Sequence, residues 1–175
     1  MCTIFCNINR TYILFLGVII IFYTHLEDYI NELYKDMSIN EPGQLSIKNI
    51  AKKLKINIIY GRVSLYFENY IVLKRSTSEK EWQLFGEEVC HYLRHIGNHI
   101  PMHELFMDYQ ENQANYFSYH FCVPTFMLND IEIPTTHRIM ETFNVEQHFA
   151  ERRLEMYKNK LLLEGRRNES SLIRI

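Results

Sequence analysis

The chain has 175 residues, of which 47% are hydrophobic and 23% charged, and its formal net charge is −2. This length is typical of one globular domain with a core of its own and is short for two. The charge leaves no overall basic field for a nucleic-acid backbone, so we expect no direct nucleic-acid binding. The cysteines at 2, 6, 90 and 122 are too few and too irregularly spaced for a disulfide framework, which favours a reducing cytoplasm.

Residues 1–23 differ in character from the rest. Tyr12–Tyr23 is an unbroken run of twelve apolar or aromatic residues. A membrane span needs about 20 such residues, and a signal peptide needs a small-residue cleavage site that is absent after this run. We therefore expect 1–23 to be an extension outside the fold, or the product of a misplaced start codon. A membrane anchor is the less favoured alternative.

The region 24–73 predicts two helices and then three short strands. Thr24 can cap the first helix because Glu27 follows three residues later, which is the spacing of a capping box. The strand segments are rich in β-branched and aromatic residues and are separated by short turns, which is typical of a small antiparallel meander. The expected elements are helices at 24–34 and 47–54 and strands at 56–60, 64–67 and 70–73.

After residue 73 the pattern is helical, with Pro101, Pro124 and Pro134 separating the segments. Only the tail 165–175 is expected to be disordered. These elements predict a single α+β domain over 24–164, with two N-terminal helices, a small antiparallel sheet and a helical C-terminal half. The expected helices are 78–96, 107–122, 124–128, 135–143 and 145–163.

The residues with recognisable chemistry are concentrated at 85–95. Glu88 and His91 have the spacing of the last four residues of H-E-x-x-H. In that motif two ligands four residues apart project from one helix face onto a metal ion, and the Glu between them takes a proton from the metal-bound water. Glu87 occupies the first ligand position. The Glu88 and His91 spacing alone is near what chance predicts, so the surrounding sequence has to support the interpretation.

Across roughly 24–157 the chain resembles the ImmA/IrrE family of metallopeptidases, in particular its phage and mobile-element branch. The family layout is H-E-x-x-H, then E-x-x-A-N-x-F, then a small-apolar run ending in Pro. This chain has Glu-Glu-Val-Cys-His at 87–91, Glu-Asn-Gln-Ala-Asn-Tyr-Phe at 111–117, and Phe-Cys-Val-Pro at 121–124. The resemblance implies a zincin-like α+β domain with the metal between helices 78–96 and 107–122.

The resemblance also implies roles for individual residues. Glu88 matches the general base, His91 the second ligand of the motif, and Glu111 the carboxylate ligand of the following helix, while Glu87 stands in place of the first His. Three protein ligands and a water would make an open zinc site. A carboxylate at 87 adds negative charge, which suits manganese, iron or magnesium relatively better and makes a metal-bound water a weaker acid. We therefore expect weaker activity than a His at this position would give.

Other histidines and cysteines offer alternative sites. His91, His95, His99 and His103 recur every four residues, but Gly97 should end the helix, so only a shifted His91/His95 pair remains as an alternative. His95 is more simply a supporting or structural residue. We interpret His103-Glu104-Leu105 as a loop. His120 is interpreted as structural, with a role facing the cleft as the alternative. Cys90 and Cys122 are expected to be core thiols.

A DNA-binding interpretation is less favoured. The segment 47–54 is similar to the first helix of a helix-turn-helix, but the β-branched segment 56–60 follows where a recognition helix would be needed. The basic residues of 145–163 are interleaved with Glu146, Glu151 and Glu155, which favours a solvated amphipathic face.

The resemblance implies a cytoplasmic, zinc-type metallo-endopeptidase that cuts a helix-turn-helix repressor of a prophage or mobile element, and so acts as an anti-repressor. The alternative is a pseudo-peptidase, in which Glu87 abolishes turnover and the domain binds the repressor without cutting it. The sequence does not favour membrane association.

Overall fold

The computed structural model describes residues 24–94 and 104–172, with side chains for 24–94 and 107–163. The expected extension 1–23, together with His95, His99 and His103, lies outside the described residues. The elements in chain order are α1 (His25–Asp36), a 3₁₀ turn (Pro42–Gln44), α2 (Ile47–Leu54), β1 (Asn57–Gly61), β2 (Leu65–Phe67), β3 (Tyr70–Lys74), α3 (Ser78–Arg94), α4 (Glu104–Cys122), α5 (Thr125–Leu128), α6 (Thr136–Phe143) and α7 (Gln147–Leu172).

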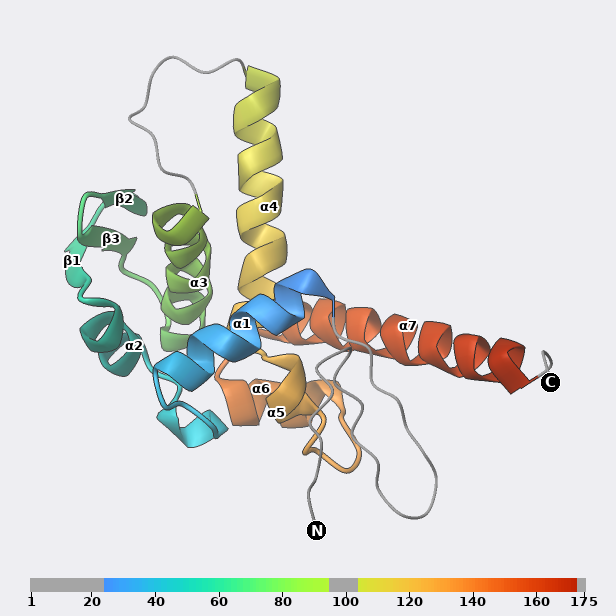
Figure 1. Ribbon diagram of the computed structural model, residues 1–175. Coiled ribbons are helices and arrows are strands. Elements are labelled where there is room, and N and C mark those ends of the chain that lie inside the picture. Colours follow the sequence, from blue (N-terminus) through green and yellow to red (C-terminus); the bar gives the residue numbers. More distant parts are fainter. Residues whose placement is uncertain (1–23, 95–103, 173–175) are drawn as a thin grey trace, which may run out of the picture.

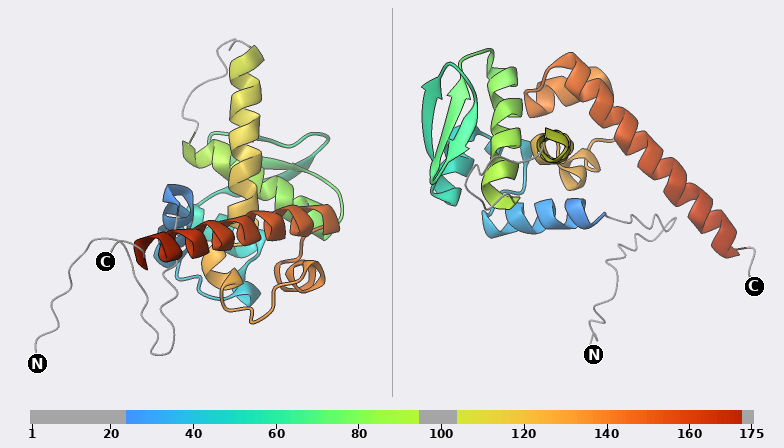
Figure 2. Two further views of the ribbon diagram at one scale, coloured as in Figure 1. Left: turned by 90° about the vertical axis from the view of Figure 1, so that its right-hand side faces the viewer. Right: turned by 90° about the horizontal axis from the view of Figure 1, so that it is seen from above.

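The α+β fold class is confirmed, and α3 lies between the sheet and α4 (Figures 1 and 2). The first helix begins as expected, because the Thr24 side chain accepts from the Glu27 amide while the Glu27 carboxylate accepts from the Thr24 amide. The segment after α2 is strand β1, so a helix-turn-helix is absent there.

The predicted antiparallel meander is wrong in its pairing. The strand order is β1-β3-β2, with β1 parallel to β3 and β2 antiparallel to β3. The hairpin β2–β3 forms at the predicted Glu68-Asn69 turn, but β1 pairs with β3 rather than with β2, the next strand in the sequence. The central strand carries Ile71 and Leu73, both fully buried, whereas β1 and β2 are mostly exposed. Burial of the most apolar strand therefore decides the order, since a central strand has neighbours on both sides.

Two helix boundaries also differ from the expectation. α4 begins at Glu104, so Glu104 and Leu105 are helical rather than part of a loop. α7 continues to Leu172, so the expected disordered tail is helical over 165–172. Gly165 within a helix is unfavourable by only about 1 kcal/mol, which neighbouring helix-forming residues can offset.

The domain boundaries at 24 and 164 stay a prediction. Within 24–94 and 104–172, no helix is long and apolar enough to cross a membrane.

The core is built around Phe121 of α4. Its ring stacks on Tyr34 and Phe117, at centroid distances of 5.3 and 5.5 Å, and contacts Trp82 and Phe85 of α3. The Tyr34 hydroxyl donates to the Phe121 carbonyl at 2.7 Å, which satisfies a polar group inside this aromatic cluster. Cys90 and Cys122 are fully buried free thiols, as expected.

Gly86 sets how closely α3 approaches α4. A Cβ added at this position would lie 2.8 Å from Cys122 Sγ and 3.3 Å from Ser118 Cβ. The two helices can therefore pack at their present distance only because Gly86 has no side chain.

We expect Gly86→Ala to lower the free energy of unfolding by about 1–3 kcal/mol, since overpacking outweighs the helix propensity of alanine. Urea unfolding measures the change. In a Cys122→Ala background the closest atom is gone, so Gly86→Ala should cost clearly less there, although Ser118 Cβ remains at 3.3 Å. An equal loss in both backgrounds would contradict the packing explanation.

Candidate active site

The candidate residues lie on two packed helices. α3 carries Glu87, Glu88 and His91, and α4 carries Glu111. His91 Nε2 lies 3.5 Å from Glu111 Oε1, with the histidine nearly buried and the carboxylate largely exposed. The structure therefore brings together the second motif ligand and the following-helix carboxylate that the sequence predicts.

Glu88 is the buried carboxyl of the site. It is 8% exposed, and its pKa is raised to about 8 by burial, with further contributions from the negative charges of Glu87 and Glu111. Burial also raises the pKa of the half-buried Glu87; Lys80 opposes this rise and Glu111 adds to it. Three carboxyl groups thus repel one another in a partly dry environment, which favours either a bound proton or a nearby cation.

Tyr66 of β2 contributes a contact that sequence reasoning missed. Its ring is parallel to that of His91, with centroids 5.9 Å apart and an interplanar angle of 2°. Burial and the charge of Glu88 raise the pKa of the Tyr66 hydroxyl. A single aromatic residue in a three-residue strand carries no signal of this role, because the contact depends on how the sheet sits on α3.

The residues fit a divalent metal only in part. An imidazole and a carboxylate are suitable ligands, and the surrounding negative charge favours a cation. Within the described residues, however, no group of three His, Cys, Asp or Glu side chains is placed to hold a metal ion. Glu87 is one helical turn from His91 but does not complete the set, so the full ligand set Glu87, His91 and Glu111 stays a prediction.

The chemistry of the described side chains follows from Glu88. With a pKa of about 8 this carboxyl is mostly protonated at neutral pH and can donate a proton. It can accept one only when a nearby positive charge lowers that pKa. A metal ion would supply this charge and would polarise a peptide carbonyl.

His120, for which a cleft-facing role was the alternative, lies in a buried polar cluster away from these residues. The cluster joins α1, α4, α5 and α7. Glu27 accepts from the Thr125 hydroxyl at 2.5 Å and from Lys160 Nζ at 2.8 Å, and Arg153 donates to Thr125 Oγ1 at 2.7 Å. His120 Nδ1 lies 3.9 Å from Glu27 Oε1, and neither ring nitrogen makes a hydrogen bond.

This cluster predicts a dependence of stability on pH. Burial, followed by the charge of Arg153, lowers the pKa of His120 from 6.5 to about 3; Glu27 opposes this and Lys160 adds to it. Below pH 6.5 the unfolded chain therefore binds a proton at His120 that the folded chain does not, so the contribution of His120 to stability falls as the pH is lowered, opposite in sign to that of Glu88. From pH 6.5 to 5 the loss is about 2 kcal/mol.

We expect His120→Gln and His120→Phe to lack this part of the acid sensitivity, because neither side chain titrates. Urea unfolding between pH 5 and 7.5 measures the effect as a wild-type minus variant difference that grows with acidity. The lowered pKa of Glu27 acts below its ordinary value of 4.5 and lies outside this window. A difference that does not change with pH would contradict the assignment.

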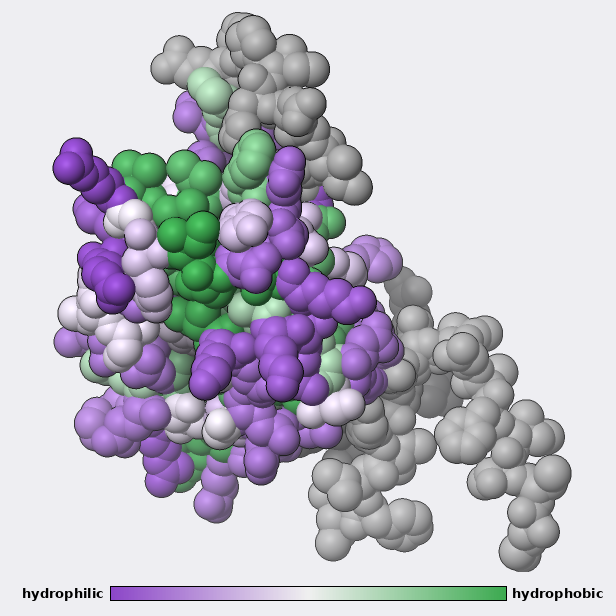
Figure 3. All heavy atoms as spheres, turned by 90° about the vertical axis from the view of Figure 1, so that its left-hand side faces the viewer, coloured by the Kyte–Doolittle hydropathy of each residue, from purple (hydrophilic) through white to green (hydrophobic). Residues whose placement is uncertain are grey.

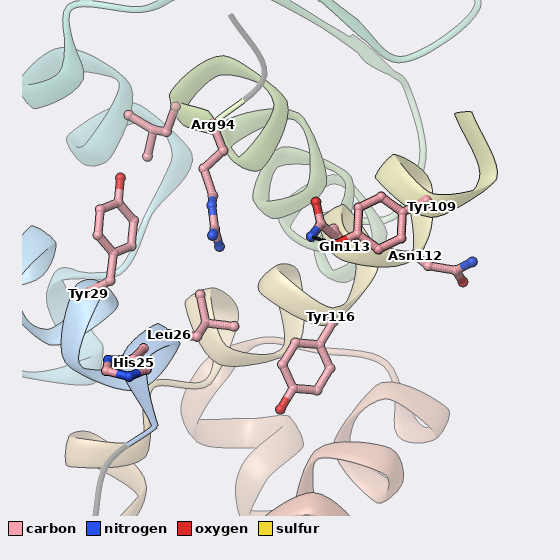
Figure 4. A pocket seen from close by; sticks show the side chains of 9 residues that line it. His25, Leu26, Tyr29, Arg94, Tyr109, Asn112, Gln113 and Tyr116 are labelled. Carbon is pink, nitrogen blue, oxygen red and sulfur yellow. Dashed lines mark hydrogen bonds between the residues drawn. The ribbon is translucent and has the colours of Figure 1, made fainter. Parts of the chain in front are cut away.

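A separate pocket of about 740 Å³ lies among α1, the end of α3 and α4. In Figure 4 the side chains of Tyr29, Arg94, Tyr109 and Tyr116 surround it. The Arg94 guanidinium carbon lies 5.9 Å from the Tyr29 ring centroid. None of the lining residues is a candidate ligand or base, so this pocket is not part of the candidate active site.

A buried glutamate beside a histidine–carboxylate pair, on two packed helices next to a small sheet, defines a metallopeptidase-like α+β domain. The family model of the IrrE N-terminal-like domain (Peptidase_M78) matches residues 44–155, which include all four candidate residues. The chain belongs to this family, and the resemblance found in the sequence is confirmed.

Two curated relatives are similar over most of the chain. The phage-like element PBSX protein XkdA of Bacillus subtilis (strain 168) is 40% identical over 148 residues, which cover 78% of this chain and 75% of the relative. The uncharacterized protein YqaB of the same organism is 37% identical over 149 residues, which cover 79% of this chain and 87% of YqaB. No solved structure matches the chain significantly.

Proposed function

We propose that the chain is a metal-dependent endopeptidase of the cytoplasm that cleaves a helix-turn-helix repressor of a prophage or mobile element. The observation that carries the proposal is the placement of buried Glu88 next to the His91–Glu111 pair. The name of the relative XkdA, a phage-like element protein, supports a prophage context. Two buried free thiols are compatible with a reducing compartment.

The metal we expect is zinc, held by His91 and Glu111 with Glu87 as third ligand after a rearrangement of its side chain. Because Glu87 is a carboxylate, manganese, iron or magnesium is the alternative. In either case the role of Glu88 is to hold a proton taken up at the site and to pass it to the leaving amine.

The edge strand β2 supports a peptide substrate. Among the described strands it is hydrogen-bonded to β3 alone, and its Tyr66 ring is parallel to that of His91. An extended peptide can pair with an exposed strand edge through its backbone, which would bring a scissile bond alongside His91 and Glu88.

The test uses the full chain, loaded in turn with zinc and manganese, and the helix-turn-helix repressor encoded in the same element. We expect discrete repressor fragments by mass spectrometry, loss of cleavage with a chelator, and loss by about 10²–10⁴-fold in Glu88→Gln. His91→Ala should lose both metal and cleavage. Glu88→Gln should still bind repressor, because the change removes a proton acceptor and leaves the surface shape intact.

The second candidate is a repressor-binding module without turnover. The observation that favours it is the absence of a three-ligand group among the described side chains, with Glu87 at the first ligand position. This candidate predicts repressor binding of equal affinity with and without chelator, and no fragments with either metal. That result would exclude the endopeptidase.

A further inference from the structure

The outer face of the sheet, turned away from α3, carries apolar side chains in register. Ile59 of β1 is opposite Val72 of β3, which is opposite Leu65 of β2. The next row joins Tyr70 to Phe67. Because side chains alternate along a strand, these residues lie on the face opposite the buried Ile71 and Leu73. We call the set Ile59, Leu65, Phe67, Tyr70 and Val72 the outer sheet face.

This face is unusually exposed for such large apolar groups. Ile59 is 47% exposed, Leu65 40% and Phe67 60%, and the neighbouring Val63 is 59% exposed. Figure 3, which views the molecule from the sheet side, shows a continuous hydrophobic patch over the strands with hydrophilic residues around it. No described helix covers this face, since α3 packs on the other one (Figure 2). A contiguous apolar patch with a polar rim is typical of an interaction site.

The segment 48–75, which contains α2 and the three strands, is strongly basic although the whole chain has a net charge of −2. Residues 48–75 contain seven cationic side chains and one carboxylate, Glu68, which gives this segment a net charge of +6. All seven are exposed, and none makes an ion pair with a carboxylate of the described chain. Lys74 lies on the outer face itself, in the row beyond Val72. The cations are Lys48, Lys52, Lys53, Lys55, Arg62, Lys74 and Arg75, and the last three, which lie in or directly beside the strands, are called the basic rim.

We propose that the outer sheet face docks an acidic amphipathic helix of a partner protein. Three strands span about 10 Å between the outer strand axes, close to the diameter of one helix with its side chains. A helix on a sheet face is also the usual way in which an uncovered layer is completed. Apolar residues of the partner helix contact the Ile59–Val72–Leu65 row, and its carboxylates face the basic rim.

The composition of the face favours this occupant over nucleic acid. Bases stack on aromatic rings, whereas the central row is aliphatic and the two aromatic residues, Phe67 and Tyr70, form only the row beside it.

The experiment uses the full chain and a fluorescein-labelled 18-residue helical peptide with leucine on one face and glutamate on the other. Fluorescence anisotropy measures its affinity at low and moderate salt. We expect micromolar binding that weakens at least 10-fold with salt, and no comparable binding of a peptide with lysine in place of glutamate or of a scrambled acidic peptide.

Two variant pairs test the two halves of the surface. Leu65→Thr with Val72→Thr removes apolar contact while keeping strand-forming residues, and Arg62→Glu with Lys74→Glu lowers the net charge of residues 48–75 from +6 to +2. Each pair should weaken binding of the acidic peptide at least 10-fold, whereas Lys158→Glu on exposed α7 should leave this affinity unchanged. Circular dichroism checks that each variant is folded.

Several results would overturn the proposal. The proposal is wrong if the wild-type chain does not bind the acidic peptide, or if all variants bind it with the same affinity as the wild type. Tighter binding of an 18-nucleotide single strand or of phosphatidylglycerol vesicles, lost in the same variants, would assign the face to those ligands. Self-association in sedimentation that is lost in Leu65→Thr with Val72→Thr would assign it to a second copy of this chain.

Discussion

Glu87→His is expected to raise the affinity for Zn²⁺ by on the order of 100-fold. The introduced imidazole and that of His91 would project from the same face of α3, and Glu111 already lies 3.5 Å from His91. Four-ligand sites bind zinc with about 10–16 kcal/mol, so one well-placed ligand contributes about 3 kcal/mol. Competition with a chromophoric chelator measures the affinity, and repressor cleavage should rise with zinc occupancy.

Glu87→Gln is the matched control for this change. It removes the same negative charge beside Glu88 and keeps the length of the side chain, but it adds no imidazole. We expect Glu87→Gln to leave zinc affinity unchanged or weaker. If Glu87→His binds zinc no better than Glu87→Gln, position 87 is not a ligand position and the assignment of the whole set is wrong.

Arg153→Ala should lower the free energy of unfolding by about 3–5 kcal/mol. Arg153 is 1% exposed and donates from Nε to the Val123 carbonyl at 3.0 Å, as well as to Thr125 Oγ1. Its removal leaves the carbonyl without this donor, deprives buried Glu27 of a nearby positive charge and opens a cavity. Since a domain of this size is stable by about 5–15 kcal/mol, the loss is a large part of the total. Urea unfolding measures it.

The neighbouring arginine is the control. Arg152 is exposed and pairs with Glu155 at the surface, at 2.6 Å. Arg152→Ala should change stability by less than about 1 kcal/mol, because water screens such a pair. Similar losses in the two variants would mean that the buried cluster does not stabilise the fold as we infer.

The sequence predicts most of the helices because their apolar spacing and caps are local. Thr24 with Glu27 and Thr135 with Arg138 form the N-terminal caps through contacts three residues apart. Strand order is not local. The chain from 56 to 73 has the same alternation whether β1 pairs with β2 or with β3, and only burial of Ile71 and Leu73 against α3 distinguishes the two.

In the candidate site, too, some features follow from the local sequence and others depend on tertiary contacts. Glu88 and His91 follow from motif spacing, and Glu111 followed only from a family resemblance, since nothing in its own helix marks it. Tyr66, the raised pKa of Glu88 and the Glu27–Thr125–Arg153 cluster depend on tertiary contacts between elements far apart in the chain. None of these leaves a pattern in the amino-acid sequence.

The bond between Glu27 and Lys160 joins residues 133 positions apart, and both lie outside the family-matched segment 44–155. The buried polar cluster therefore extends beyond the matched segment at both ends. During synthesis the buried charge of Glu27 has no lysine partner until α7 has left the ribosome. The polar cluster around Glu27 is therefore completed only after residue 160 has emerged, and its formation carries the entropic cost of a contact between distant positions.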